Sequence, residues 1–463
     1  MRDSISKLGR LGVIVQTLMR HGLWAVVDQL GLADRNLVTR PTGKERGAAR
    51  FGRRLSLALN DLGPTFVKLG QILSTREDML PPAIVRELEQ LQDNARPVAT
   101  RAVRKEIQRS LGQRIGELYS FFDDEPLAAG SIGQVHRART QEGDEVVVKV
   151  RRPGIEAVVE SDLQLLLSVA EMAANRSADI ARHDPVGFVE EFGRSLKAEL
   201  DFVREAEFMD RMRAEVGGTA YVPRVYAELS TESVMTVEYV EAVKVTAIDG
   251  DGVRRRLARQ VVACFATQFL RNELFHADPH AGNVVQRSDG ELVLFDMGAI
   301  GTLDPTMRRT LHAFSVAAGE CDGDGAAEAL LQMVHVPADL EKARYRQDMG
   351  DFLAQLLGRP LAEANYPALI RQGLEVTRQH GLRLRTEYFL LLRATILVDG
   401  VLRSLDPDID PIKATRSYIL RSWFTREWFP LATKLVFGTV WARLTGMFRR
   451  KRRPPPALPE KTA

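Results

Sequence analysis

Residues 276–283 read HADPHAGN, and residues 295–298 read FDMG. The first stretch places two histidines, an aspartate and an asparagine around a proline and a glycine, which is too polar and too turn-prone for a buried element. Asp278 and Asn283 lie five positions apart, and Asp296 follows thirteen residues later, directly after a strand-like run. Three oxygen-bearing side chains on two neighbouring loops therefore form the strongest chemical signal in the chain.

These side chains suit a nucleotide-bound metal. Mg²⁺ takes one or two protein oxygens together with substrate phosphates, so Asn283 and Asp296 are the candidate ligands. Asp278 is then left to orient or deprotonate a nucleophile. Protein kinases divide the work in this way between a catalytic-loop Asp, an Asn five residues later and the Asp of a DFG loop. A turn closed by local Asx hydrogen bonds is the alternative interpretation, and a zinc site is disfavoured because soft ligands are few.

A second kinase-like pattern lies upstream, where residues 128–135 read AAGSIGQV. The stretch follows GxGxxGxV with Ala128 in place of the first glycine. It opens a predicted hairpin whose second strand, EVVVKV at 145–150, carries Lys149 where kinases carry the lysine of VAIK. The pattern predicts that loop amides cover phosphates and that Lys149 contacts them. The retained pattern positions are Gly130, Gly133 and Val135.

Lys149 needs a carboxylate to hold it. Residues 185–216 are predicted to form one long charged amphipathic helix that offers several acids. We expect Glu205 to be the partner, and Glu199 and Glu207 remain alternatives. A single acid on such a helix could also form only a surface pair at i,i+4, worth ~0.3–0.5 kcal/mol.

Taken together, these motifs resemble the UbiB family of atypical, protein-kinase-like proteins. That family has an alanine-rich loop in place of a glycine-rich one, a KxGQ motif ahead of the kinase lobe, and an ExD motif before the ion-pair glutamate. The resemblance covers about residues 40–420. The corresponding residues here are Ala128-Ala129-Gly130-Ser131 for the loop, Lys68-Leu69-Gly70-Gln71 for KxGQ, and Glu199-Leu200-Asp201 for ExD, with Glu205 six residues after Glu199.

The KxGQ motif suits a helix, because Lys68 and Gln71 at i,i+3 share one face while Gly70 lets another backbone approach closely. The resemblance implies that this helix folds over the active site and that Lys68 pairs with Glu199. A helix in that place would occupy the groove in which a protein kinase receives its peptide. Protein substrates are therefore not expected.

Two positions depart from the family pattern. Met297 replaces the Phe of DFG, which changes packing but leaves Asp296 and Gly298 in place. Ala281 stands where the family commonly has Pro, which loosens the loop without removing a ligand. We expect His276 to be a structural hydrogen-bonding residue rather than an acid or a base.

The composition excludes several classes. The chain has 463 residues, of which 45% are apolar and 27% charged, so it is long enough for more than one core. A balance of 64 basic and 61 acidic residues gives no overall field for nucleic acid. The two cysteines, Cys264 and Cys321, exclude a disulfide framework and favour a reducing compartment. No small-residue cleavage site follows the N-terminal basic and apolar run, so a secretory signal peptide is not expected.

The patterns predict an α+β fold class. The resemblance implies a two-lobed protein-kinase-like fold with a helical N-terminal extension and a helical C-terminal tail. Strands are predicted at 233–240 and 291–295, and apolar residues at helical spacing mark the extension at Leu55, Leu59, Leu62, Phe66, Leu69 and Leu73. The predicted regions are a helical extension with KxGQ at 1–105, a kinase-like N-lobe at 106–245, a helical C-lobe at 246–420, and an amphipathic and basic tail at 421–463.

The tail carries a membrane-directed signal, since residues 428–448 read WFPLATKLVFGTVWARLTGMF and RRKRR follows. Its apolar side chains gain ~4 kcal/mol on insertion, while Lys434 and Arg443 cost up to ~2.5–3.5 kcal/mol each at a helix centre. We therefore expect the segment to lie at the membrane surface, with its basic residues on anionic lipid. Docking on the core is the alternative, and the N-terminal segment 7–24 admits both interpretations.

The resemblance implies that Mg²⁺ and ATP bind between the lobes, with adenine along backbone groups of Glu238-Tyr239-Val240. The expected reaction is ATP hydrolysis or phosphoryl transfer to a small-molecule or lipid acceptor, supporting isoprenoid-quinone (ubiquinone) biosynthesis. The expected small-molecule partner is a lipid or an isoprenoid. The protein is expected to be cytoplasmic and to contact the membrane peripherally, and a homodimer mate or a biosynthetic complex is the expected protein partner. Nucleic acid is not an expected partner. The alternatives are an aminoglycoside- or choline-type small-molecule kinase, which should lack KxGQ, and a non-enzymatic nucleotide-binding scaffold.

Overall fold

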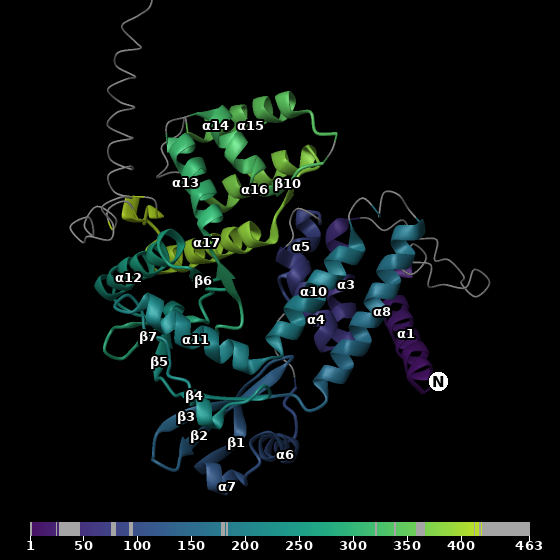
Figure 1. Ribbon diagram of the computed structural model, residues 1–463, viewed down its shortest axis with the longest axis vertical. Helices are drawn as coiled ribbons and strands as arrows, with labels where there is room; N and C mark the ends of the chain where they lie inside the picture. Colours follow the sequence, from purple (N-terminus) through teal and green to yellow (C-terminus); the bar gives the residue numbers. More distant parts are fainter. Residues whose placement is uncertain are drawn as a thin grey trace, which may run out of the picture. The chain divides into compact units, whose positions relative to one another are not determined.

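The computed structural model divides the chain into two compact units (Figure 1). The first unit holds Met1–Val243 and Arg287–Ile300, and the second holds Lys244–Gln286 and Gly301–Ala463. The residues that the structure describes are 2–24, 26, 47–75, 80–91, 96–176, 181, 184–319, 322–337, 339–357, 366–411, 413–415 and 418.

A four-stranded antiparallel sheet forms the centre of the first unit. The predicted hairpin is confirmed as β2 and β3, and the predicted strand at 233–240 is confirmed as β4. Val146, Val148 and Val150 alternate along β3 and are fully buried in the core beneath the sheet. The strands, in spatial order, are β1 (Tyr119–Ala129), β2 (Gly133–Thr140), β3 (Glu145–Arg151) and β4 (Val234–Glu238).

Strand β1 is an edge strand that the sequence pattern did not reveal. Its sequence, YSFFDDEPLAA, lacks regular alternation and contains Pro126, and its pairing with β2 shifts register three times. Two short helices precede it and pack on the sheet, and a turn of 3₁₀ helix precedes β4. They are α6 (Thr100–Leu111), α7 (Ile115–Leu118) and η1 (Ala227–Leu229).

The helical part of the first unit has a core of its own. The apolar residues predicted at helical spacing pack there, with Leu59, Leu62 and Phe66 buried. Helix α1 buries Ile14 and Leu18 in the same core, which favours the core-docked interpretation of the N-terminal segment. The helices are α1 (Arg2–Arg20), α3 (Ala48–Leu62), α4 (Pro64–Thr75), α5 (Pro82–Leu88) and α8 (Ile155–Arg176), the last of which was not predicted.

The prediction of one helix over 185–216 is wrong, because the chain forms α10 (Pro185–Glu199) and α11 (Phe202–Val216). Asp201 has an extended backbone between them, and its carboxylate accepts hydrogen bonds from the amides of Val203 (3.0 Å) and Arg204 (3.3 Å). This side chain caps α11, so it favours a new helix start over continuation of α10.

The second unit is mainly helical. Tyr345 and Met349 of α15 are buried among residues of the neighbouring helices in its core. Its elements are η2 (Val245–Ala247), α12 (Asp251–Leu270), β6 (Leu274–His276), α13 (Pro305–Gly319), α14 (Gly323–Leu331), β10 (Val334–His335), α15 (Lys342–Leu357), α16 (Tyr366–Gln379), β11 (Arg383–Leu384) and α17 (Thr386–Leu405).

Three short strands mark where the chain passes from one unit to the other. A fourth, β8 (Leu292–Leu294), lies in the first unit and confirms the strand predicted at 291–295. The three strands at the passages are β5 (Ala242–Lys244), β7 (Val284–Arg287) and β9 (Ile300–Thr302).

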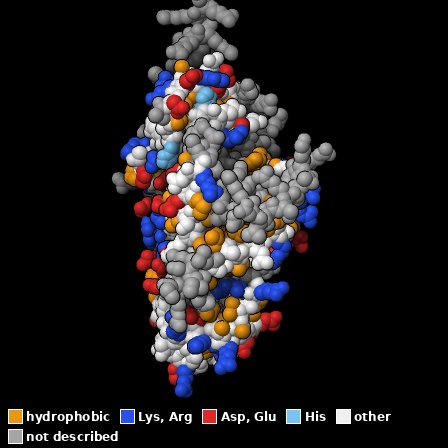
Figure 2. Space-filling view, turned by 90° about the vertical axis from the view of Figure 1, so that its right-hand side faces the viewer, with side chains coloured by type: hydrophobic (Ala, Val, Ile, Leu, Met, Phe, Trp, Pro, Cys, Tyr) orange, Lys and Arg blue, Asp and Glu red, His pale blue; other side chains and the backbone are white. Residues whose placement is uncertain are grey.

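Two regions discussed from the sequence fall outside the described residues, namely the whole tail at 421–463 and Cys321. Cys264 is a buried free thiol. Within the part of the chain that the structure describes, every helix is too short or too polar to cross a bilayer. On the face shown in Figure 2, basic and acidic side chains are interspersed, in keeping with the near-neutral charge balance.

Candidate functional site

Lys149 lies in the middle of the sheet and forms the predicted ion pair. On β3 it is opposite Val135 of β2 and Met235 of β4. Its Nζ donates to both carboxylate oxygens of Glu205, at 2.8 and 2.7 Å. Glu205 is only 6% exposed and stands in the first turn of α11, where the helix dipole favours a negative charge. The structure therefore selects Glu205 over Glu199 and Glu207.

The charge on Lys149 is held by its surroundings. Burial alone would lower the pKa of its ammonium, but the charges of Glu205 and Asp296 and the hydrogen bond from Lys149 to Glu205 raise the pKa above its ordinary value. The ammonium also lies 5.0 Å from the centroid of the Phe202 ring, a cation–π contact. Lys149 is consequently a fixed positive charge at the surface of the sheet.

Asp296 has an unusual backbone for a non-glycine residue. Its φ of 55° lies in the left-handed region, which aspartate tolerates better than most residues because its side chain can bond locally. The carboxylate accepts a hydrogen bond from the Gly298 amide at 3.1 Å. The next side chain, Met297, is fully buried, while Asp296 itself is exposed. The turn thus anchors its apolar residue in the core and presents its carboxylate outward.

The alanine-rich loop joins β1 to β2. The Gly130 amide donates to the Gly133 carbonyl at 2.8 Å, which closes the loop on itself. A Cβ atom at Gly133 would lie 2.8 Å from the Val150 carbonyl oxygen, so this position requires glycine. Ser131 is buried, whereas Ala128 is exposed at the end of β1 and Ala129 is half-buried. The predicted phosphate-binding residues from Ala128 to Gly133 therefore lie together at one short turn between adjacent strands.

The KxGQ helix is α4, and Lys68 forms an ion pair with Glu199 at the end of α10, as the resemblance implied. The side chains are 17% and 33% exposed. The expectation that Gly70 admits another backbone is wrong. A Cβ atom there would lie 2.3 Å from Leu91 Cδ1 and 2.8 Å from Leu59 Cδ1, so side chains of the helical core fill the space.

The loop of the second unit is held by local hydrogen bonds. His276 is fully buried, and its Nδ1 accepts from the Asp278 amide at 3.1 Å, which agrees with the expected structural role. The Gln268 side chain accepts from the His276 amide at 2.8 Å. Asn283 donates from Nδ2 to the Asp278 carbonyl at 3.1 Å. Its nitrogen is engaged in the loop, so its oxygen is the atom suited to a cation.

A residue that the sequence did not reveal holds Asp278. Arg393 of α17 donates from Nη2 to Asp278 Oδ1 at 2.8 Å, and the side chains are 30% and 28% exposed. The two residues lie 115 positions apart, so no local pattern connects them. The available signal was an arginine inside the apolar run FLLLRATILV at 389–398, where a charge calls for a partner.

The segment predicted to contact adenine, Glu238-Tyr239-Val240, begins at the last residue of β4. The amides of Glu238 and Tyr239 donate to the carbonyls of Arg224 (2.9 Å) and Glu145 (3.0 Å), so both are already engaged. The Glu238 carboxylate accepts from the Tyr221 hydroxyl at 2.5 Å. Burial and this hydrogen bond raise the pKa of Tyr221 to about 12. Val240 lies just beyond β4 and is half-buried.

The predicted metal ligands belong to different units, Asp296 to the first and Asn283 to the second. Their convergence on one ion accordingly stays a prediction. Their oxygen donors match the chemistry of Mg²⁺. Among the described residues, no group of three or more His, Cys, Asp or Glu side chains is placed to hold a metal.

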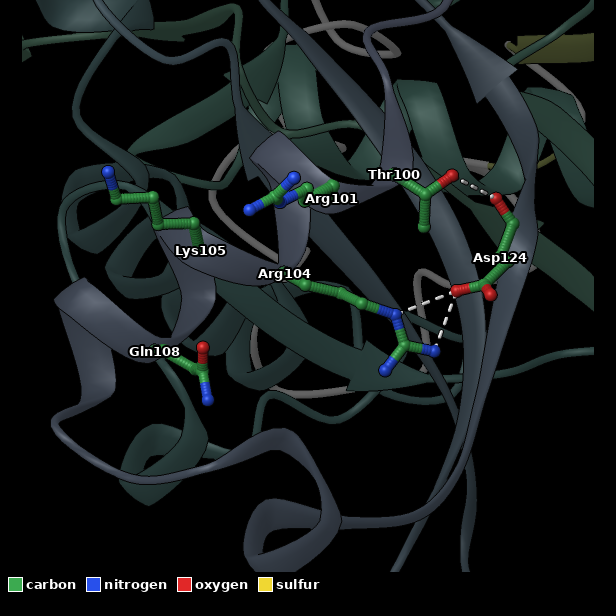
Figure 3. Close-up of a pocket in the computed structure, with 6 residues that line it drawn as sticks. All are labelled: Thr100, Arg101, Arg104, Lys105, Gln108 and Asp124. Atoms are coloured by element: carbon green, nitrogen blue, oxygen red, sulfur yellow. Dashed lines mark hydrogen bonds and ion pairs between the residues drawn. The ribbon is translucent and has the colours of Figure 1, made fainter.

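A hollow of about 450 Å³ lies elsewhere in the first unit, on α6 and β1 (Figure 3). One wall is an ion pair, in which Arg104 Nε donates to Asp124 at 2.8 Å. Thr100 also donates to the Asp124 carbonyl, at 2.9 Å. None of the sequence-predicted site residues lines it; the lining residues are Thr100, Arg101, Arg104, Lys105, Gln108 and Asp124.

Comparison with known proteins agrees with the motifs. The chain matches the ABC1 atypical kinase-like domain over residues 90–330 and the UbiB helical domain over residues 349–410. A Pseudomonas putida protein named "Probable protein kinase UbiB" is 34% identical over 431 residues, covering 90% of this chain and 77% of that protein. An Aeromonas hydrophila protein of the same name is 34% identical over 400 residues, covering 84% and 73%.

A solved structure shares the fold. The complex of Rv3197 with erythromycin from Mycobacterium tuberculosis superposes with a TM-score of 0.56 at 23% identity, covering 76% of this chain and 90% of that one. The predicted α+β, kinase-like fold is confirmed by this likeness and by the domain match. Because the domain match spans more than half of the chain and the relatives align along most of their length, this protein belongs to the UbiB family of ABC1 atypical kinase-like proteins.

Proposed function

We propose that this protein binds Mg-ATP and either hydrolyses it or transfers its phosphoryl group to a small-molecule or lipid acceptor. The observation that carries the proposal is the ion pair between Lys149 and the buried Glu205, close enough to Asp296 for the charge of that carboxylate to raise the pKa of Lys149. A lysine held charged on a strand, opposite a glycine-containing loop, provides the fixed cation that a triphosphate needs. A surface ion pair would not require a glutamate that is 94% buried.

Each residue has a part in this proposal. Lys149 contacts phosphate oxygens, and Glu205 keeps its ammonium in place. Asn283 and Asp296 would hold Mg²⁺, which neutralises phosphate charge when it is bound. Asp278 orients the attacking oxygen. Adenine would lie along Glu238-Tyr239-Val240 at the end of β4, where the Val240 backbone is the candidate contact because the amides of Glu238 and Tyr239 are engaged.

The ion pair between α4 and α10 supports an acceptor other than a peptide. Lys68 binds Glu199, which lies only six residues before the Glu205 that positions Lys149. A helix tied this closely to the nucleotide-binding residues competes with an extended peptide for the same space. Water, a small molecule or a lipid headgroup needs less room than an extended peptide.

The proposed pathway and cellular location are supported by the names of the relatives and by the sequence of the tail. The relatives carry the name UbiB, which favours a role in isoprenoid-quinone (ubiquinone) biosynthesis with a lipid or isoprenoid acceptor. The sequence of the tail, apolar and aromatic and then RRKRR, favours peripheral contact with the cytoplasmic face of a membrane. A homodimer or a biosynthetic complex remains part of the proposal.

Phosphate release from Mg-ATP tests the proposal. We expect the wild type to release phosphate faster with anionic liposomes present, and Asp296→Asn to lose at least about 100-fold in rate. Lys68→Ala should change the rate without abolishing it. If Asp278→Asn equals the wild type at a background rate while nucleotide still raises the thermal midpoint, the protein is a scaffold and the enzymatic proposal is wrong.

A further inference from the structure

Two ion pairs of the first unit, Lys68–Glu199 and Lys149–Glu205, are joined by a link of two residues, Leu200 and Asp201. Glu199 ends α10 immediately before the link and binds Lys68. Glu205 follows in the first turn of α11 and binds Lys149. Any shift of the link therefore moves one ion pair relative to the other.

Arg151 fixes this link to the sheet. Its Nη1 donates to the Leu200 carbonyl at 2.6 Å and to the Glu232 carbonyl at 3.2 Å. Its Nη2 lies 2.8 Å from Glu156 at the start of α8. The side chain is 8% exposed, so these contacts are made by a buried guanidinium whose planar donors fit several acceptors at once. Lys149 precedes it by two residues on β3 and lies on the same face of the strand.

Phe202 makes a second connection from the link to the nucleotide-binding residues. It is fully buried, and its amide donates to the same Glu232 carbonyl at 3.2 Å. Its ring lies beneath the Lys149 ammonium, and a Cβ atom at Gly133 would be 3.4 Å from its Cζ. The first residue of α11 thus touches both Lys149 and the start of β2.

We propose that Arg151 is a positioning residue that couples the Lys68–Glu199 ion pair to the Lys149–Glu205 ion pair. When Lys68 releases Glu199, the end of α10 is free to move, and the link carries that movement to Glu205 and Phe202. Arg151 transmits it because the guanidinium ties the link to the strand that bears Lys149. The affinity for nucleotide then depends on whether Lys68 is paired, and by linkage nucleotide changes how firmly Lys68 is held.

This coupling rests on the proposed function, and a double-mutant cycle tests it. Binding of a non-hydrolysable Mg-ATP analogue is measured calorimetrically for the full chain as wild type, Lys68→Met, Arg151→Met and the double variant. We expect Lys68→Met to change the affinity at least about fivefold in the wild type and less than about twofold in Arg151→Met. An equal effect of Lys68→Met in both backgrounds overturns the proposal, even if Arg151→Met is less stable.

Matched variants separate coupling from loss of charge or of stability. Arg139→Met removes an arginine of β2 whose partner is Glu145, and it should leave the Lys68→Met effect unchanged. Arg151→Lys keeps a cation that reaches one carbonyl, and it should restore part of the coupling. If Arg151→Met fails to fold, Phe202→Leu replaces it, and retention of the full Lys68→Met effect in that variant contradicts the inference.

A second readout works without nucleotide. The rate at which an amine-reactive reagent labels Lys149, followed by mass spectrometry, reports how firmly Glu205 holds it. Lys68→Met should change this rate in the wild type and not in Arg151→Met. If the wild type binds no Mg-nucleotide, the proposed function is wrong while the labelling rates still decide the coupling.

Discussion

The two units hold the charged residues of the proposed site in different ways. In the first unit, Lys149 and Glu205 form a two-oxygen contact, and the glutamate is nearly inaccessible to solvent. In the second unit, Asp278 is 28% exposed, and one oxygen of its carboxylate is bound by Arg393 from α17. The first contact joins strand β3 to the buried first turn of α11, whereas the second fixes the direction of a partly exposed carboxylate. The comparison predicts that disrupting the first contact lowers stability, while disrupting the second changes activity at little cost in stability.

The largest effect on stability is expected from Lys149→Met. The substitution leaves Glu205 buried without its cation, which should cost about 3 kcal/mol, the low end for a broken buried pair because Lys149 is 27% exposed. Urea unfolding monitored by circular dichroism measures this. Lys149→Met with Glu205→Leu should recover most of the loss, and a double variant as unstable as the single one contradicts the explanation.

Gly133→Ala should have the next largest effect on stability. The added Cβ atom would meet the Val150 carbonyl at 2.8 Å, and backbone cannot give way as a side chain can. We expect about 1–3 kcal/mol of lost stability and weaker nucleotide binding. Gly116→Ala is the control, because a Cβ atom there meets no atom within 4 Å. Equal stability of the two variants would show that the β2 strand adjusts.

Arg393→Met tests the other side of the comparison. The pair is partly exposed, so stability should fall by no more than about 1 kcal/mol. The rate of phosphate release should fall about tenfold with an unchanged KM for ATP, because the Asp278 carboxylate loses its orientation. Arg393→Lys should restore part of the rate. A wild-type rate in Arg393→Met means that Asp278 needs no such support.

The smallest effect concerns Tyr221 at alkaline pH. Its folded-state pKa of about 12 lies above the ordinary value of about 10, so the folded state favours the neutral phenol. The contribution of the neutral Tyr221 phenol to the stability of the fold is intact below about pH 10, and it is lost as the pH rises toward 12. Absorbance titration of phenolate should show one high-titrating tyrosine fewer in Tyr221→Phe. If Tyr221→Phe instead removes phenolate absorbance that develops near pH 10, the Tyr221 hydroxyl lies in water, away from Glu238.

Local patterns predicted the elements that carry their own signal. The β2–β3 hairpin, β4 and β8 have β-rich runs bounded by turns, and the helical core of the extension follows its apolar spacing. The break between α10 and α11 was missed because a single capping aspartate, Asp201, outweighs the continuous helical pattern around it. Strand β1 was missed because an irregular edge strand needs only one partner and shows no alternation.

By itself the sequence determined which chemical groups are available. These are a lysine on the second strand of a hairpin, a glycine-containing turn before the first strand, and oxygen-bearing side chains on two loops. They could be predicted because they follow from residue type and short spacing. Tertiary structure decided which of several acids on adjacent helices binds Lys149, that Arg151 ties the α10–α11 link to β3, and that Arg393 reaches Asp278. These contacts join residues 49 to 115 positions apart. Only burial and packing bring such residues within hydrogen-bonding distance, and neither is written in local periodicity.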